Sequence, residues 1–440
     1  MKKRIIFFFL ITLSPYGRAD NTLAGVIQRT LKTNPEVLIT VNNRRAADQQ
    51  LKQAKGGYWP SVDLTGGYGR ETSENTSTRN ITGGDLTLTR SEMGLTLSQM
   101  LFDGFDVKYR VAQQNSRVNS AAYKVQDSSE SIALITAEVY LEILRRRELV
   151  ELSKDNVVIH QKILEQIHIL VKGGAGRQAD AQQTASRLAL AKSRLVSAQG
   201  HLRNAEINYK RVTGELPKTL LVPARAPIEA VLPATPEAGL DIAWSKHPSL
   251  RVTNADLEAA AAAHKQTKSA FMPHLSLELG ITNNENLDGV EGEHDDRIAM
   301  LRMRYNLFRG GADKARRQET AERVGAAKEE RRRIQRIIEE DVYLSWNSLT
   351  TIRGRLAYLK EHQTSTEKVL NSYKEQFKLG KRSLLDVLDS ENELFNARAS
   401  LVSAQYTEIF SLLKILKSMG LLLGALDIRR PEEAETYTWR

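Results

Sequence analysis

The chain has 440 residues, 63 of them basic and 53 acidic, and a formal net charge of +10. Its hydrophobic share of 41% is typical of a folded protein and excludes a disordered one. The positive charge is too mild and too dispersed to indicate nucleic acid as a partner. Cysteine is absent, so we expect neither disulfides nor a lipid anchor on an N-terminal cysteine.

Residues 1–19 have the pattern of a secretory signal peptide. Three basic residues open the segment, an apolar run extends from Ile5 to Leu13, and Gly17 and Ala19 are small residues suited to cleavage. The apolar run is about half of the roughly 20 residues that a membrane span needs, so an uncleaved anchor is the weaker interpretation. Removal of the segment takes away four basic residues and lowers the net charge from +10 to +6.

The first strand pattern begins where helical, charged sequence breaks at Trp59-Pro60 and alternation of period two follows at once. The same event recurs in the stretch SAFMPHLSLELGIT at 269–282. Three of the predicted strands are near the 9–11 residues of a tilted membrane-spanning strand, and the second is longer. The pattern predicts four strands, at about 60–71, 85–102, 273–283 and 297–308.

Polar residues occupy one face of these predicted strands and would suit a water-filled interior. They are Asp63, Thr65, Ser276, Glu278, Arg302, Arg304 and Asn306. A soluble sheet lying on helices is the alternative, and alternation alone leaves the two about even.

Aromatic residues at the junctions of helix and strand favour the membrane interpretation, because such residues collect at bilayer interfaces. Long polar loops between the paired strands favour it as well. Four strands cannot close a barrel and lipid excludes open sheet edges, so several chains would share one barrel, and three chains would give twelve strands. The junction aromatics are Tyr58, Trp59, Phe102, Phe271 and Phe308.

The chain is a tandem repeat. An offset of 213 aligns Pro35 with Pro248, and after the strands an offset of 206 aligns Gly214 with Gly420. Each copy has the order helix, strand, loop, strand, very long helix, tight turn, helix. The predicted organisation is a signal peptide at 1–19, repeats at 20–230 and 231–422, and a C-terminal tail at 423–440.

The long helix of the first copy extends from about Phe105 to Lys172 without Pro or Gly, which corresponds to roughly 100 Å. Val111, Val118 and Val125 within it fall seven residues apart, a spacing typical of coiled-coil packing. This seam indicates how the helices pack and not what they do.

The chain resembles the TolC family of outer-membrane channels over essentially its whole mature length. The stretch LTRSEMGLTLSQMLFDGFDVKYRVAQQ at 88–114 is most similar to the branch that serves type I secretion of large adhesins, the LapE or agglutination-protein type. The resemblance implies a mixed α/β membrane protein in the outer membrane of a Gram-negative bacterium. It also implies a homotrimer with a shared 12-stranded barrel and a periplasmic helical tunnel, a periplasmic membrane-fusion adaptor, and through that adaptor an inner-membrane ABC transporter or another pump.

The second tight turn, at 378–386, contains the first residues of the motif GKRSLLDVLD, which extends from Gly380 to Asp389. The resemblance implies that Asp386 and Asp389 surround the periplasmic mouth and act in gating and selectivity. Their spacing of three places both on one helix face, so three chains would bring six carboxylates together. The alternative is a pair of solvated acids that the helix dipole favours in the first turns.

The first tight turn, KGGAGRQAD at 172–180, contains glycines that permit a sharp reversal, and Asp180 is placed to cap or precede the returning helix. The resemblance implies that both turns dock the adaptor. The predicted docking residues are Gly174, Gly176, Arg177, Asp180, Gly380, Lys381, Arg382 and Ser383.

Motifs of catalysis are absent from the sequence. The eight His residues have no metal-ligand spacing, and no phosphate-binding loop or nucleophile elbow is present. We therefore expect no enzyme, metal or cofactor, and an energy source supplied by a partner. The predicted function is a duct that exports an unfolded protein, with small-molecule efflux as one alternative. A periplasmic coiled-coil adaptor is the alternative of another class, but the β domain that should interrupt its helical hairpin is not seen.

Overall fold

The computed structural model describes residues 21–437, so the predicted signal peptide at 1–19 lies outside the described residues. The described chain divides into two compact units. The first comprises the chain up to Val41 together with Lys124–Leu250 and Ile334–Ala434. The second comprises Asn42–Tyr123, Arg251–Arg333 and the chain from Glu435. Within residues 21–437, no helix combines the length and apolar character needed to cross a bilayer.

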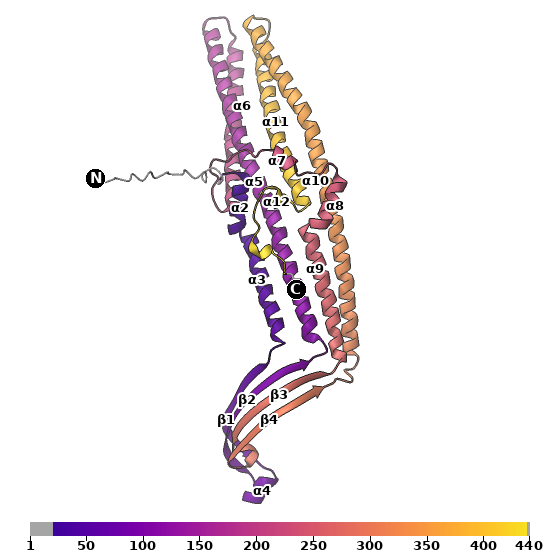
Figure 1. Ribbon diagram of the computed structural model, residues 1–440. Helices are drawn as coiled ribbons and strands as arrows, with labels where there is room; N and C mark the ends of the chain where they lie inside the picture. Colours follow the sequence, from indigo (N-terminus) through magenta and orange to yellow (C-terminus); the bar gives the residue numbers. More distant parts are fainter. Residues whose placement is uncertain (1–20, 438–440) are drawn as a thin grey trace, which may run out of the picture. The chain divides into compact units, whose positions relative to one another are not determined.

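Two helical hairpins dominate the first unit. One consists of α5 (Asp106–Lys172) and α6 (Gln178–Thr213), and the other of α10 (Ala312–Lys378) and α11 (Leu384–Ser418) (Figure 1). The starts of α5 and α10, up to Tyr123 and Arg333, belong to the second unit. The turns of both hairpins lie at the same end, where side chains of α5, α6 and α11 form one buried cluster. Its buried members are Ile167, Ala181, Leu384 and Leu388.

The main core of the first unit lies along the seam that the heptad spacing predicts. Val125 and Ile132 of α5 are buried, whereas Val139 is only half-buried. An α-helix has 3.6 residues per turn, so a seven-residue stripe drifts slowly off the packing face. Tyr140 and Tyr209 are the largest fully buried side chains of this core, which also takes in α2 (Leu23–Thr33).

The predicted C-terminal tail also belongs to this core up to Ala434. Leu423 and Ile428 are buried, around the short helices α12 (Leu422–Ala425) and η3 (Glu432–Ala434). The tail is held by Glu130 of α5, whose carboxylate accepts from Arg430 Nη2 at 3.0 Å and from Leu423 N at 3.4 Å. Burial raises the pKa of Glu130, and the neighbouring Arg430 opposes that shift.

Each repeat opens with a helix pair joined at a proline. Further helices of the described chain are α3 (Pro35–Gly56), α7 (Ala226–Glu229), α8 (Pro236–Lys246), α9 (Pro248–Gln266) and η1 (Thr267–Phe271). The helix ends before Pro35 and Pro248 because the preceding residue is extended, at ψ 125° in Asn34 and 124° in His247.

The side chain before each proline stabilises this junction. Asn34 Oδ1 accepts a hydrogen bond from Glu36 N at 2.9 Å, and His247 Nδ1 accepts one from Ser249 N at 3.2 Å. Both bonds span two residues, so the Asn34 amide in the first repeat and the His247 imidazole in the second accept the equivalent backbone hydrogen bond.

The second unit contains an antiparallel sheet of order β1-β2-β3-β4 (Figure 1). Its strands are β1 (Ser61–Ser73), β2 (Leu86–Phe102), β3 (His274–Glu285) and β4 (Glu293–Arg304). The helix α4 (Thr76–Thr82) joins β1 to β2, and η2 (Leu287–Gly289) joins β3 to β4.

The predicted bounds of the fourth strand, 297–308, are wrong. β4 begins four residues earlier, at Glu293, because the ladder continues into the polar segment, where Asn283 Nδ2 donates to Asp295 Oδ1 at 2.6 Å. It ends at Arg304, before Gly310 and Gly311, both of which have positive φ. Asn306 therefore lies outside the sheet and not on its polar face.

The strand register places most of the apolar residues on one face, although Ile298 and Met300 of β4 pair with Gly280 and Glu278 on the other. Leu64 faces Leu95, Leu95 faces Ile281, and Leu277 faces Leu301, while Glu278 and Ser98 pair on the opposite face. Leu64 and Leu301 are 67% and 61% exposed, so no segment within residues 21–437 covers the apolar face at these positions. Other exposed members of this face are Val62, Tyr68, Met93 and Met303.

Candidate functional site

The turn of the second hairpin is closed by glycine and a capping box. Gly380 has φ +69°, and its amide donates to Phe377 O at 2.9 Å. Ser383 then caps α11: its Oγ accepts from Asp386 N at 3.2 Å and donates to Asp386 Oδ2 at 2.8 Å. Asp386 thus takes part in the start of α11 through its contacts with Ser383.

Arg382 of this turn lies against an aromatic ring. Its guanidinium carbon is 4.0 Å from the centre of the Tyr373 ring, and its Nη1 is 3.8 Å from Asp386 Oδ2. Its Nε is buried and makes no hydrogen bond among the described residues. The stacked ring therefore fixes the guanidinium beside Asp386.

The second predicted gate residue, Asp389, has a partner in the other hairpin. Arg187 Nη2 of α6 donates to Asp389 Oδ1 at 2.7 Å. Seven residues further along α6, Arg194 Nη1 donates to Asn392 Oδ1 at 2.5 Å. Although Asp386 and Asp389 are only three residues apart on α11, the structure gives them different cationic neighbours.

The turn of the first hairpin has a different helix start. Gly174 has φ +76°, and the amides of Ala175 and Gly176 both donate to Leu170 O, at 2.9 and 3.0 Å. A Cβ on Gly176 would lie 3.0 Å from Val171 N, a tight contact that a larger residue could make only if the neighbouring backbone shifted slightly.

Arg177 is the N-cap of α6 and makes no side-chain capping bond. The expectation that Asp180 caps or precedes the helix is wrong, because α6 begins at Gln178 and Asp180 lies within its first turn. There its carboxylate is near the positive end of the helix dipole and needs no capping contact to be favourable.

The predicted interface aromatics gather in the second unit where helices meet strands. Trp59 and Phe308 are strongly exposed, Tyr58 and Phe271 are moderately exposed, and Phe102 is half-buried. Phe102 contacts the ring of Phe105 edge to face, with 5.5 Å between ring centres. Sequence reasoning missed Phe105 and Tyr305, two further exposed aromatics at the same junctions that their position beside Phe102 and Phe308 could have indicated.

The loop end of the sheet is tied together by Arg90 of β2. Its Nη1 is 3.1 Å from a Glu71 oxygen and 3.2 Å from Asp288 Oδ1, and its Nε bonds Glu92. Asn75, which caps α4, donates to Asp288 O at 2.7 Å. The two polar loops are therefore joined to each other.

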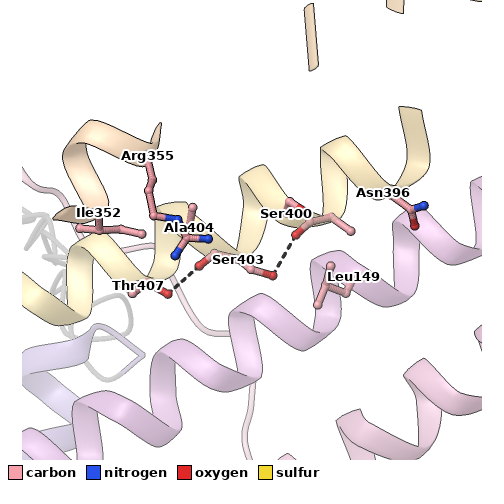
Figure 2. A pocket seen from close by; sticks show the side chains of 9 residues that line it. Leu149, Ile352, Arg355, Asn396, Ser400, Ser403, Ala404 and Thr407 are labelled. Carbon is pink, nitrogen blue, oxygen red and sulfur yellow. Dashed lines mark hydrogen bonds between the residues drawn. The ribbon is translucent and has the colours of Figure 1, made fainter. Parts of the chain in front are cut away.

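A hollow of about 600 Å³ lies between α5, α10 and α11 in the first unit (Figure 2). Small side chains of α11 form its floor, and Figure 2 shows Arg355 reaching across them. Ser403 Oγ and Thr407 Oγ donate to carbonyls of their own helix, at 2.8 and 2.9 Å, so their donors are already used.

No group of three His, Asp or Glu side chains in residues 21–437 is arranged to hold a metal ion. His160 is buried among α5, α6 and α11, and this burial lowers its pKa.

The chain matches the family model described as outer membrane efflux protein, over residues 26–215 and 239–421. The match takes in well over half of the chain. The chain belongs to the outer membrane efflux protein family. The two matched segments correspond to the two repeats, so the predicted tandem plan is confirmed.

Curated relatives from three bacteria match nearly the whole chain. The outer membrane efflux protein BepC of Brucella suis is 24% identical over 97% of this chain and 91% of that protein. The outer membrane protein TolC of Vibrio cholerae is 23% identical over 96% of each chain. The alkaline protease secretion protein AprF of Pseudomonas aeruginosa is 21% identical over 94% of this chain and 87% of that protein.

A solved structure shows the same fold. The CmeC outer membrane channel of Campylobacter jejuni superposes with a TM-score of 0.78 at 17% identity, covering 91% of this chain and 86% of that one. The predicted TolC-like fold, with four strands in each chain, is confirmed. The predicted location in the outer membrane of a Gram-negative bacterium is confirmed as well. Channels of the outer membrane efflux protein family are homotrimers that work with membrane-fusion adaptors and inner-membrane pumps.

Proposed function

We propose that this chain is the outer-membrane duct of a type I secretion system and passes an unfolded protein, a large adhesin, out of the cell. The observation that carries the duct is the four-stranded sheet, whose apolar face is exposed and whose outer strands β1 and β4 have free edges. Lipid would cover that face, and three copies would pair the edges into twelve strands.

The choice of a protein cargo is supported by two similarities. The segment 88–114 resembles the adhesin-secretion branch, and AprF is named as a protease secretion protein. BepC is named as an efflux protein, which favours small-molecule efflux as the second candidate. In either case a periplasmic adaptor would dock at the turns of the two hairpins, and a pump of the inner membrane would supply the energy.

Deletion of the gene tests the cargo. We expect one large surface protein to disappear, with unchanged susceptibility to detergents, dyes and antibiotics, and the gene supplied in trans to restore that protein. Unchanged surface proteins together with increased drug susceptibility would contradict protein secretion and support efflux.

We further propose that Asp386 and Asp389 of three chains surround the periplasmic mouth and favour cations. Support comes from their position beside the turn of the second hairpin and from the access that partial exposure gives to ions, at 40% and 55% of the side chain. In planar bilayers the Asp386→Asn, Asp389→Asn double variant should weaken block by a trivalent cation at least tenfold. Unchanged block would remove the proposed role.

A further inference from the structure

Arg187 adds a positive charge to the surroundings of the proposed mouth that the two-aspartate motif does not contain. It lies on α6, 202 residues away from Asp389 in the chain, and binds that carboxylate at 2.7 Å. Both side chains remain partly exposed, at 31% for Arg187 and 55% for Asp389. The pair is therefore accessible to ions in the surrounding water.

We propose that Arg187 is a specificity-determining residue of the channel: its guanidinium is the counter-ion of Asp389 and reduces the negative charge that an entering cation meets. This inference rests on the proposed function, in which three copies of Asp386 and Asp389 surround the mouth. Three copies of Arg187 then offset three of the six carboxylates.

The packing of α6 on α11 keeps Arg187 in place. An isolated exposed ion pair contributes little to stability, so its geometry needs support from its neighbours. Buried Thr184 and Leu188 flank Arg187 in α6, and the bond from Arg194 to Asn392 joins the same two helices one heptad further along. The guanidinium consequently stays within reach of Asp389 even when the ion pair itself is weak.

The two aspartates differ in how closely an arginine approaches their carboxylates. Arg187 is in hydrogen-bond contact with Asp389, whereas Arg382 is 3.8 Å from Asp386 and lies on the Tyr373 ring. A pair of opposite charges in direct contact has a field that falls off within a few ångströms, and salt at about 0.1 M screens the remainder beyond about 10 Å. Asp389 therefore contributes less than a full negative charge as long as Arg187 is present.

Ion block of the full-length trimer in planar bilayers tests the inference. The probe is hexamminecobalt(III) in about 0.1 M KCl, where screening leaves the local charge detectable. Arg187→Gln should lower the concentration for half-block roughly tenfold, and Asp389→Asn should raise it by a similar factor. Because the two changes cancel in charge, the half-block concentration of the double variant should lie within about twofold of the wild-type value. Arg187→Lys keeps the positive charge and should also lie within about twofold of that value.

Asn392→Ala is the matched control. It removes the bond between Arg194 and Asn392 from the same helix pair without any change of charge, and block should stay as in the wild type. If Asp389→Asn weakens block while Arg187→Gln has no effect, the role of Arg187 is refuted and the proposed mouth stands. If neither change has an effect, both the role of Arg187 and the part of Asp389 in the proposed mouth are refuted, and the Asp386→Asn, Asp389→Asn double variant then decides whether Asp386 acts there alone. A heat-modifiable trimer on gels verifies that each variant folds.

Discussion

The last helix of each repeat ends in the same backbone turn, but the residues packed around that turn differ between the repeats. Gly214 after α6 has φ +83° and Gly420 after α11 has φ +71°, a conformation that closes a helix in both places. A Cβ on Gly214 would meet nothing within 4 Å, whereas a Cβ on Gly420 would lie 2.7 Å from Pro248 Cδ and 3.1 Å from His247 Cα. The backbone requirement is therefore shared by the repeats, while the tight packing against the proline junction belongs to the second repeat alone.

Replacement of the two glycines by alanine should have the most unequal effects. Gly214→Ala meets only the cost of a side chain in the left-handed region, about 1 kcal/mol. Gly420→Ala adds a clash with backbone and a proline ring, for a total of about 3 kcal/mol per chain. Denaturant unfolding of the purified trimer measures both variants, and equal losses would contradict the packing difference.

His247 should make the junction of the second repeat sensitive to acid. Burial, opposed by Asp127 and Asp341 and aided by Lys417, lowers its pKa from 6.5 to about 4. The unfolded chain takes up the proton first as pH falls, so this site's contribution to stability is complete above pH 6.5 and is lost towards pH 4. At pH 5 the loss is about 2 kcal/mol per chain.

The substitution His247→Asn copies the first repeat, where Asn34 accepts the equivalent bond without titrating. We expect this variant to show about 2 kcal/mol less destabilisation between pH 8 and pH 5 than the wild type. Thermal unfolding at the two pH values, with Asn34→Ala as the control for a lost junction bond, measures the difference. The same acid loss in the variant and in the wild type would exclude His247 as its source.

The hairpin turns offer a smaller and reciprocal comparison. Ser383→Ala removes the capping bond to Asp386 N and should destabilise the first turn of α11 by about 1 kcal/mol. Arg177→Ser supplies a cap that α6 lacks and should stabilise its first turn by up to about 1 kcal/mol. Amide hydrogen exchange in the first turn of α11 should become roughly fivefold faster in Ser383→Ala. In the first turn of α6 it should become roughly fivefold slower in Arg177→Ser. Changes in the same direction would refute the assigned caps.

Much of the fold could be predicted from the sequence because it depends on local patterns. Alternation, prolines and glycines indicated the four strands and the tight turns, and the repeat offsets paired the two halves. The start of β4 at Glu293 escaped prediction because ladder hydrogen bonds extend a strand into polar sequence that has no apolar alternation.

The candidate site was less predictable because its contacts cross between distant segments. Arg187 and Asp389 are 202 residues apart, and neither residue's neighbours in the sequence indicate the other. The stacking of Arg382 on Tyr373 likewise depends on how α10 ends against the turn. Asp180 and Asp386 align in the repeats, yet only Asp386 has a Ser three residues earlier to complete a capping box.

Conductance of the purified full-length protein in a planar bilayer tests the central claim most directly. The exposed apolar face and the free edges of the sheet require lipid and further copies of the chain, so a detergent-extracted trimer should insert and give discrete conductance steps. A monomer that stays in solution without detergent and conducts no ions would contradict the account.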